Sequence, residues 1–348
     1  MDLQGRFGVS FLPGRVVDVI GWARVAEELG YARVGIGDSP SLYREPWVTL
    51  AAVASATSTL PVGVWVTNPI TRHPLVTASA ARTLAELAPG RIFVGVATGD
   101  SGLEGAGYAP APVDALAEYV RVLRELLATG TSTYDGRPVR LPWPDSGPAI
   151  PVYVAAHGER TIRLAGAMAD GVVLGLGIAP EVIDWSLTTL REGAEAAGRV
   201  VADLDVWWTV RYLVAEQTGA AREEMAGILA EAAHVLARTA FRSGLGPPEL
   251  RAGVERLAAE FDRARYGGGT PEQRRANARR AFELGVGDYL VDRYAFAGTP
   301  DECAAQVRRA IAAGAERFMY SMRGPDREGR LRDWHRLVVR PSALASGS

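Results

Sequence analysis

The sequence predicts a single (β/α)8 barrel, a TIM barrel, over residues 1–348. Eight short runs of apolar and β-branched residues alternate with segments whose apolar residues recur at helical spacing, and this alternation is typical of a parallel sheet covered by helices. No low-complexity tract separates the units. An open doubly wound sheet is the alternative, but eight units in one uninterrupted domain favour the closed barrel.

The first four units occupy about the first 130 residues. Strands are expected at 6–11, 31–38, 60–66 and 91–100, and helices at 15–30, 45–58, 74–90 and 113–130. Gly30 suits the left-handed residue that ends a helix, and Pro74 suits the first position of one.

The alternation breaks once and then resumes. Asp135-Gly136, between two short extended pieces, predicts a β-hairpin over 131–141, and 142–151 is expected to form an irregular arm. The remaining strands are expected at 150–156, 171–176, 204–216 and 316–321, with helices at 159–170, 180–198, 299–314 and near 327–339. Trp207 and Trp208 are adjacent on the seventh strand, so they should face opposite ways and pack in the core.

Two insertions interrupt the regular units. They cover about 101–150, after the fourth strand, and about 220–284, after the seventh, where a helical stretch is broken at 244–248 and 266–271. Because loops that follow the strands of a barrel lie at its C-terminal face, both insertions are expected to lie over that rim, where the arm at 131–150 and the helical insertion at 220–284 should shape the substrate pocket.

Composition excludes several classes of protein. A formal net charge of −2 argues against nucleic acid as the main partner, and no apolar run approaches the roughly 20 residues that cross a membrane. The N-terminus lacks the pattern of a signal peptide, so we expect a soluble, cytoplasmic protein. The single cysteine, Cys303, and four histidines without HExxH spacing indicate neither an internal disulfide nor a metal site.

Polar residues and glycines gather where the predicted strands end. In a barrel these positions converge on one face, so their shared location indicates a site more strongly than any single residue does. The set comprises Asp38, Ser39, Thr67, Asn68, Thr98, Gly99, Asp100, Ser101, His157, Gly158, Gly175 and Gly177.

The stretch VAAHGERTIRLAG, residues 154–166, has the features of an anion site. Gly158 lies at a predicted helix start, where backbone N–H groups and the helix dipole attract anions, and Arg160 and Arg163 could add charge. An ordinary helix start with exposed arginines explains the segment equally well. GVATGDSG, residues 95–102, does not fit GxGxxG in register, so we reject a dinucleotide fingerprint.

Four motifs together resemble one superfamily. VTNPITRHP (66–74), VGVATGDS (94–101), PVYVAAHGERTIRLAGAMADGVVL (151–174) and GTPDECAAQVRRAIAAGAERFMY (298–320) are similar to the luciferase-like monooxygenase superfamily. The resemblance runs from about residue 6 to 325 and is nearest to coenzyme F420-dependent reductases of the methylenetetrahydromethanopterin reductase type.

The resemblance implies a flavin or deazaflavin bound at the C-terminal face of the barrel. It implies a bulge with a non-proline cis peptide, here between Trp65 and Val66, that supports the ring. Ser10 stands where methanopterin-type relatives carry an acidic residue, which argues against the pterin substrate and its mechanism. From these motifs and the strand ends, the candidate cofactor-binding residues are Ser39, Trp65, Val66, Thr67, Asn68, Thr98, Gly99, Ala156, His157, Gly158, Arg160, Gly175, Leu176 and Gly177.

The leading hypothesis is therefore an F420H2-dependent reductase that transfers a hydride to a C=C or C=N bond of a small molecule, or oxidises an alcohol in reverse. Asp38 is the first candidate for the acid or base, with His73 and Asp100 behind it. The alternatives are an FMN-dependent monooxygenase supplied by a separate cofactor reductase, and a non-catalytic barrel. An open, basic groove would favour F420, and a closed pocket would favour FMN. The resemblance also implies a homodimer.

Overall fold

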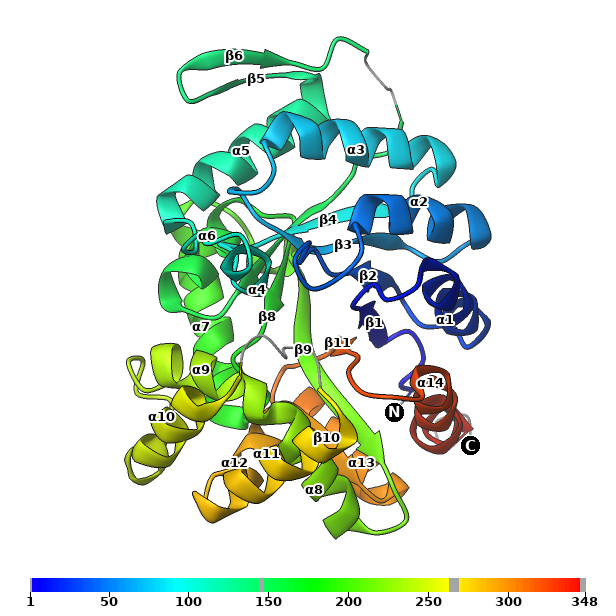
Figure 1. Ribbon diagram of the computed structural model, residues 1–348. Helices are drawn as coiled ribbons and strands as arrows, with labels where there is room; N and C mark the ends of the chain where they lie inside the picture. The colour runs from blue at the N-terminus through cyan, green and yellow to red at the C-terminus, as the bar shows by residue number, and fades with distance from the viewer. Residues whose placement is uncertain (1, 144–146, 263–268, 345–348) are drawn as a thin grey trace.

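The computed structural model describes residues 2–143, 147–262 and 269–344 of the chain. Within these ranges, eight parallel strands close into a barrel in which the last strand pairs with the first (Figure 1). The predicted TIM barrel is therefore confirmed. The barrel strands are β1 (Phe7–Phe11), β2 (Val34–Ile36), β3 (Val62–Thr67), β4 (Ile92–Val96), β7 (Val152–Ala156), β8 (Gly171–Leu174), β9 (Asp205–Val214) and β11 (Phe318–Ser321).

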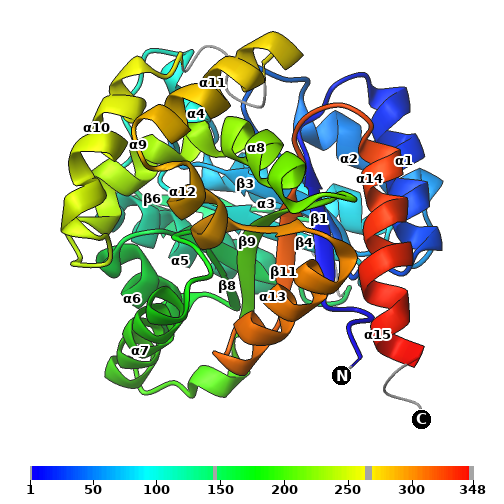
Figure 2. The ribbon, with the colours of Figure 1, turned by 90° about the horizontal axis from the view of Figure 1, so that it is seen from below.

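Helices surround the barrel strands, as Figure 1 shows, and Figure 2 gives a view of the strands from the side. Pro74 occupies the first turn of α3, and Thr299 and Glu302 form a reciprocal capping box at the start of α13. None of the described helices is both long enough and apolar enough to cross a membrane. The outer helices are α1 (Val16–Glu28), α2 (Pro46–Ala56), α3 (Pro74–Leu87), α5 (Val113–Thr129), α6 (Glu159–Met168), α7 (Pro180–Ala196), α13 (Pro300–Ala312), α14 (Arg327–Trp334) and α15 (Arg340–Leu344).

Aromatic side chains fill the N-terminal part of the barrel. Trp207 packs in a cluster with Phe93, Tyr153, Val173 and Met319, which come from four other barrel strands. Its neighbour Trp208 belongs to the separate, larger cluster of buried side chains. The two tryptophans thus pack in different parts of the core, as their adjacent positions on one strand predict.

An ion pair lies beside this cluster. The Arg33 guanidinium lies 4.2 Å from the centre of the Trp207 ring, and its Nη2 lies 2.9 Å from Asp205 Oδ2. Because Arg33 precedes β2 and Asp205 begins β9, the pair marks the N-terminal end of the barrel, away from the strand ends that carry the predicted site.

The predicted hairpin is confirmed, but it does not shape the pocket. β5 (Thr131–Tyr134) and β6 (Arg137–Arg140) pair in antiparallel fashion around Asp135 and Gly136, both with positive φ. The hairpin lies beside α5 on the outside of the barrel (Figure 1). Ser132 Oγ donates to Glu125 of that helix at 2.6 Å. The described residues of 131–150 do not line the cavity at the C-terminal ends of the strands, so the expected role of this arm is wrong, whereas the first part of the same insertion does line that cavity through Ser101, Gly102 and Pro110. Residues 144–146 of the predicted arm lie outside the described ranges.

The second insertion is helical, as expected, and has its own core. A cluster of buried residues that includes Met225, Leu236, Val254 and Leu290 holds its helices together. The break at 244–248 separates a π-helical segment (Leu236–Ala240) from α10, while the break at 266–271 falls largely outside the described residues. Its elements are α8 (Thr218–Leu229), a 3-10 turn (Ala230–Ala232), α9 (Ala233–Val235), a 3-10 turn (Pro248–Leu250), α10 (Arg251–Glu260), α11 (Pro271–Glu283) and α12 (Gly287–Tyr294).

A ninth strand in the same sheet was not anticipated. β10 (Ala295–Gly298) pairs in parallel with the outer half of β9, with Ala295 opposite Arg211 and Gly298 opposite Val214. The added pairing anchors the end of the insertion to the barrel and carries β9 beyond the barrel rim.

Candidate cofactor and active site

A cavity of about 800 Å³ lies at the C-terminal ends of the barrel strands. Residues at or just after the strand ends, such as Asp38, Thr67 and Thr98, supply one part of its wall. The insertion after β9 supplies another through Glu231, His234 and Arg238. The expectation that this insertion shapes the pocket is therefore confirmed.

A bulge at the end of β3 forms part of the cavity wall. The peptide bond between Trp65 and Val66 is cis, and the pairing of β3 with β4 shifts register between Val64 and Thr67, as the resemblance implied. Both Trp65 and Val66 line the cavity.

Glycines on the two neighbouring strands make room for this bulge. A Cβ atom at Gly35 would lie 2.5 Å from Cβ of Trp65, and one at Gly95 would lie 2.7 Å from Cγ1 of Val66. A side chain at either position would therefore displace the bulge, so the two glycines help to fix the shape of this wall.

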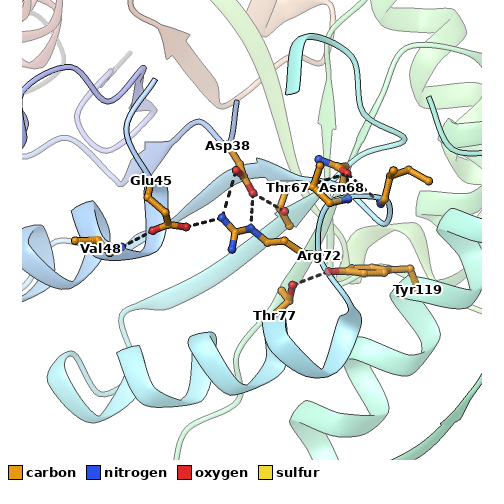
Figure 3. Close-up of polar contacts among 10 residues, drawn as sticks. Asp38, Glu45, Val48, Thr67, Asn68, Arg72, Thr77 and Tyr119 are labelled. Atoms are coloured by element: carbon orange, nitrogen blue, oxygen red, sulfur yellow. Dashed lines mark hydrogen bonds and ion pairs between the residues drawn. The ribbon is translucent and has the colours of Figure 1, made fainter. Parts of the chain in front are cut away.

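Asp38 follows β2 and is held by donors from β3 and the loop after it (Figure 3). Its side chain is 1% exposed, accepts from Thr67 Oγ1 at 2.7 Å and pairs with Arg72 Nε at 2.8 Å. Arg72 also pairs with Glu45 at 2.5 Å. Burial alone would lower the pKa of Arg72, but the carboxylates of Asp38 and Glu45 outweigh it and raise that pKa. Asp38 is thus fixed as a hydrogen-bond acceptor at the cavity wall.

The polar residues of the loop after β3 mainly hold that loop in shape. Asn68 Oδ1 accepts from the backbone N–H groups of Ile70 and Thr71 at 3.0 and 2.9 Å. His73 caps α3, since its Nδ1 accepts from Leu75 N at 3.1 Å, and its ring packs edge-on against Tyr134. His73 is not among the residues that line the cavity, so the structure favours the capping role over the catalytic one.

His157 lies on the cavity wall after β7. The ring is accessible from the cavity, yet the surrounding protein desolvates it, and this burial lowers the pKa of His157 to about 4. Asp100 opposes this effect, whereas Arg238 and His234 add to it. The imidazole is therefore neutral near pH 7 and can both donate and accept a hydrogen bond.

We expect His157 to stay neutral well below the pH at which an unfolded histidine takes up its proton, about 6.5. Because its folded-state pKa is lowered, the unfolded chain binds this proton first, so its contribution destabilises the fold as the pH falls from about 6.5 toward 4. An NMR titration, with the signal assigned through His157→Gln, measures the midpoint directly. A midpoint near 6.5 would contradict the desolvated position.

Most of the predicted cofactor-binding residues line the cavity. Three do not: Ala156 and Leu176 are buried in the core, and Gly177 lies against Arg293, where a Cβ would come 2.7 Å from the Arg293 carbonyl oxygen. Of the predicted residues, those on the cavity wall are Asp38, Ser39, Trp65, Val66, Thr67, Asn68, Thr98, Gly99, Asp100, Ser101, His157, Gly158, Arg160 and Gly175.

The sequence interpretation missed a buried charged cluster in the cavity wall. Glu231 Oε1 lies 3.0 Å from Arg211 Nη2 and 3.2 Å from Arg323 Nε, and the Glu231 side chain is 3% exposed. Arg211 could have been found, because Trp207, Thr209 and Arg211 alternate along one face of β9 and the first of them packs inside the barrel. Glu231 and Arg323 give no comparable signal.

Exposed arginines stand at another part of the cavity. Arg160 lies in the first turn of α6, close to Gly158, and Arg238 and Arg242 come from the insertion after β9. All three side chains are exposed. Together with the backbone N–H groups at the start of α6, they form a basic rim suited to phosphate and carboxylate groups.

Comparison with known proteins gives a consistent result over most of the chain. Residues 6–317 match the family model described as luciferase-like monooxygenase. The chain is 26% identical to a 5,10-methylenetetrahydromethanopterin reductase of Methanolobus tindarius, over 92% of this chain and 96% of that protein. It is 29% identical to an F420-dependent glucose-6-phosphate dehydrogenase of Nakamurella multipartita, over 93% and 92% of the two chains. The structure of a coenzyme F420-dependent tetrahydromethanopterin reductase from Methanopyrus kandleri superposes with a TM-score of 0.73 at 25% identity, covering 97% and 99% of the two chains.

Proposed function

This chain belongs to the luciferase-like monooxygenase family, and on that premise we propose that it is an F420-dependent oxidoreductase acting on a small organic substrate. The observation that carries the proposal is the basic rim of Arg160, Arg238 and Arg242 beside a cavity of about 800 Å³, in a chain similar over its length to F420-dependent enzymes.

The residues present fit this cofactor. The wall at Trp65 and Val66 would support the deazaflavin ring, and the start of α6 at Gly158 would hold the phosphate. The exposed arginines would meet the acidic oligoglutamate tail. The open, basic character of this rim favours F420 over FMN, which carries one phosphate and no such tail.

When bound, the deazaflavin supplies the hydride. The protein's part is to orient the substrate and to manage one proton for each hydride. We propose that the substrate carries a C=C or C=N bond that is reduced, with alcohol oxidation as the reverse reaction. Asp38 accepts from Thr67 and Arg72, so its role in this proposal is that of an acceptor, and of a base in the oxidative direction. Because Asp38 is held as an acceptor, another group must donate the proton that reduction requires.

The test is a pair of titrations of the purified protein, one with oxidised F420 and one with FMN, followed by cofactor fluorescence. Tight binding of F420 with weak binding of FMN is the expected result, and it would justify a screen of unsaturated and imine substrates with F420H2. The opposite preference would replace the proposal with an FMN-dependent monooxygenase. No binding of either cofactor would overturn both.

A further inference from the structure

His234 and Asp100 meet on the cavity wall although 134 positions separate them in the sequence. Asp100 follows β4, and His234 lies in α9 of the insertion. His234 Nε2 lies 2.9 Å from Asp100 Oδ2, and His234 Nδ1 lies 2.6 Å from the carbonyl oxygen of Glu231. The side chains of His234 and Asp100 are 11% and 32% exposed, so the pair is largely shielded but reaches the cavity.

This geometry fixes the number of protons. A carbonyl oxygen can only accept, so Nδ1 of His234 must carry a hydrogen to bond Glu231. A neutral imidazole has one N–H, which leaves Nε2 as an acceptor facing an oxygen of Asp100. A hydrogen bond between them therefore needs one more proton, either on Nε2 or on the Asp100 carboxyl group.

We infer that Asp100 and His234 share one exchangeable proton and supply it to the substrate during reduction. The inference rests on the proposed function and names the proton donor that Asp38 does not provide. Hydride addition to one atom of a C=C or C=N bond leaves an electron pair on the other atom. That pair forms a new bond to the proton, the N–H or O–H bond of the Asp100–His234 pair breaks with its electrons remaining on the pair, and water returns the proton.

Titratable and charged groups from several elements lie near this pair. His157, from the loop after β7, is neutral near pH 7 and interacts electrostatically with Asp100, with His234 and with Arg238 of the π-helical segment. The Glu231 carboxylate is engaged by Arg211 and Arg323. The neighbouring carboxylate that directly contacts His234 is therefore that of Asp100, and it is the group expected to retain the proton with the imidazole.

The experiment determines how many exchangeable protons the His234 imidazole and the Asp100 carboxyl group carry in the protein without cofactor. NMR of ¹⁵N-labelled histidine and ¹³C-labelled aspartate at pH 7.5, with signals assigned through Asp100→Asn and His234→Gln, reports each site. We expect either two N–H groups on His234 or a protonated Asp100 carboxyl, and loss of the extra proton in Asp100→Asn. A neutral His234 beside an ionised Asp100 would overturn the inference.

Asp333→Asn is the matched control, because Asp333 is exposed, pairs with Arg336 and does not line this cavity. It should leave the His234 signals unchanged. F420 titrations of the same variants separate this inference from the proposed function. The NMR result tests whether Asp100 and His234 share a proton, and cofactor binding tests whether the protein uses F420. If the protein binds F420 but has a neutral His234 beside an ionised Asp100, this inference is wrong and the proposed function stands.

Discussion

Replacing Glu231 with glutamine is expected to lower the free energy of unfolding by about 3–5 kcal/mol, because it leaves two buried cations without their shared anion. The Glu231, Arg211 and Arg323 side chains are 3%, 12% and 6% exposed, and both guanidinium groups bond the same Glu231 oxygen. Glutamine keeps the size of the side chain, so the loss reports charge and not a cavity. Urea unfolding followed by circular dichroism measures it.

Glu159→Gln is the matched control for this experiment. Glu159 also pairs with an arginine, Arg163, but its side chain is 57% exposed. Exposed pairs contribute about 0–1 kcal/mol, so this variant should unfold almost as the wild type does. Equal stability of Glu231→Gln and Glu159→Gln would show that the buried cluster does not hold the insertion to the barrel.

Removing Arg238 and Arg242 together is expected to weaken F420 binding by roughly 10- to 100-fold. The range corresponds to about 1.5–3 kcal/mol, the usual value of a hydrogen bond to a charged group, and the exposure of both side chains argues against a larger effect. Fluorescence titration of Arg238→Ala/Arg242→Ala at two salt concentrations measures the change. Since salt screens exposed charges, the difference in F420 affinity between the variant and the wild type should be smaller at the higher salt concentration.

Arg163→Ala provides the comparison. Arg163 lies on α6 near the same rim, but it pairs with Glu159 and Glu192 and does not line the cavity. Its removal should leave F420 affinity close to that of the wild type. If the double variant binds F420 as the wild type does, the tail does not use this rim and the preference for F420 over FMN loses its structural basis.

The barrel could be predicted because its signals are local. Each of the eight strands follows from a short apolar run bounded by turn residues, and the hairpin follows from Asp135-Gly136. β10 could not be predicted in this way, since four residues, Ala295–Gly298, carry no periodicity and become a strand only by pairing with β9. The predicted position of the hairpin was wrong for a related reason. Its packing along α5 depends on tertiary contacts such as that of Ser132 with Glu125, which local sequence does not reveal.

The residues of the candidate site likewise fall into those that the sequence predicted and those that depend on packing. Residues at strand ends, such as Asp38, Thr67 and Asp100, could be found because a closed barrel brings all of its strand ends to one face. Ala156 and Leu176 were placed by similarity of motif, and Gly177 also by its position after a strand, but packing keeps all three from the cavity wall. His73 was a candidate acid or base from the sequence, and the hydrogen bond that it accepts from Leu75 N assigns it to capping α3 instead.

The sequence by itself determined the alternation of strands and helices, the closed barrel and the face on which a site must lie, because periodicity and turn chemistry act over a few residues. Only the tertiary structure decided which polar groups meet on that face. His234 reaches Asp100, and Glu231 joins Arg211 to Arg323, because a separate hydrophobic core sets the position of the insertion over the barrel. Such side-chain contacts depend on packing between segments far apart in the sequence, and no local pattern encodes that packing.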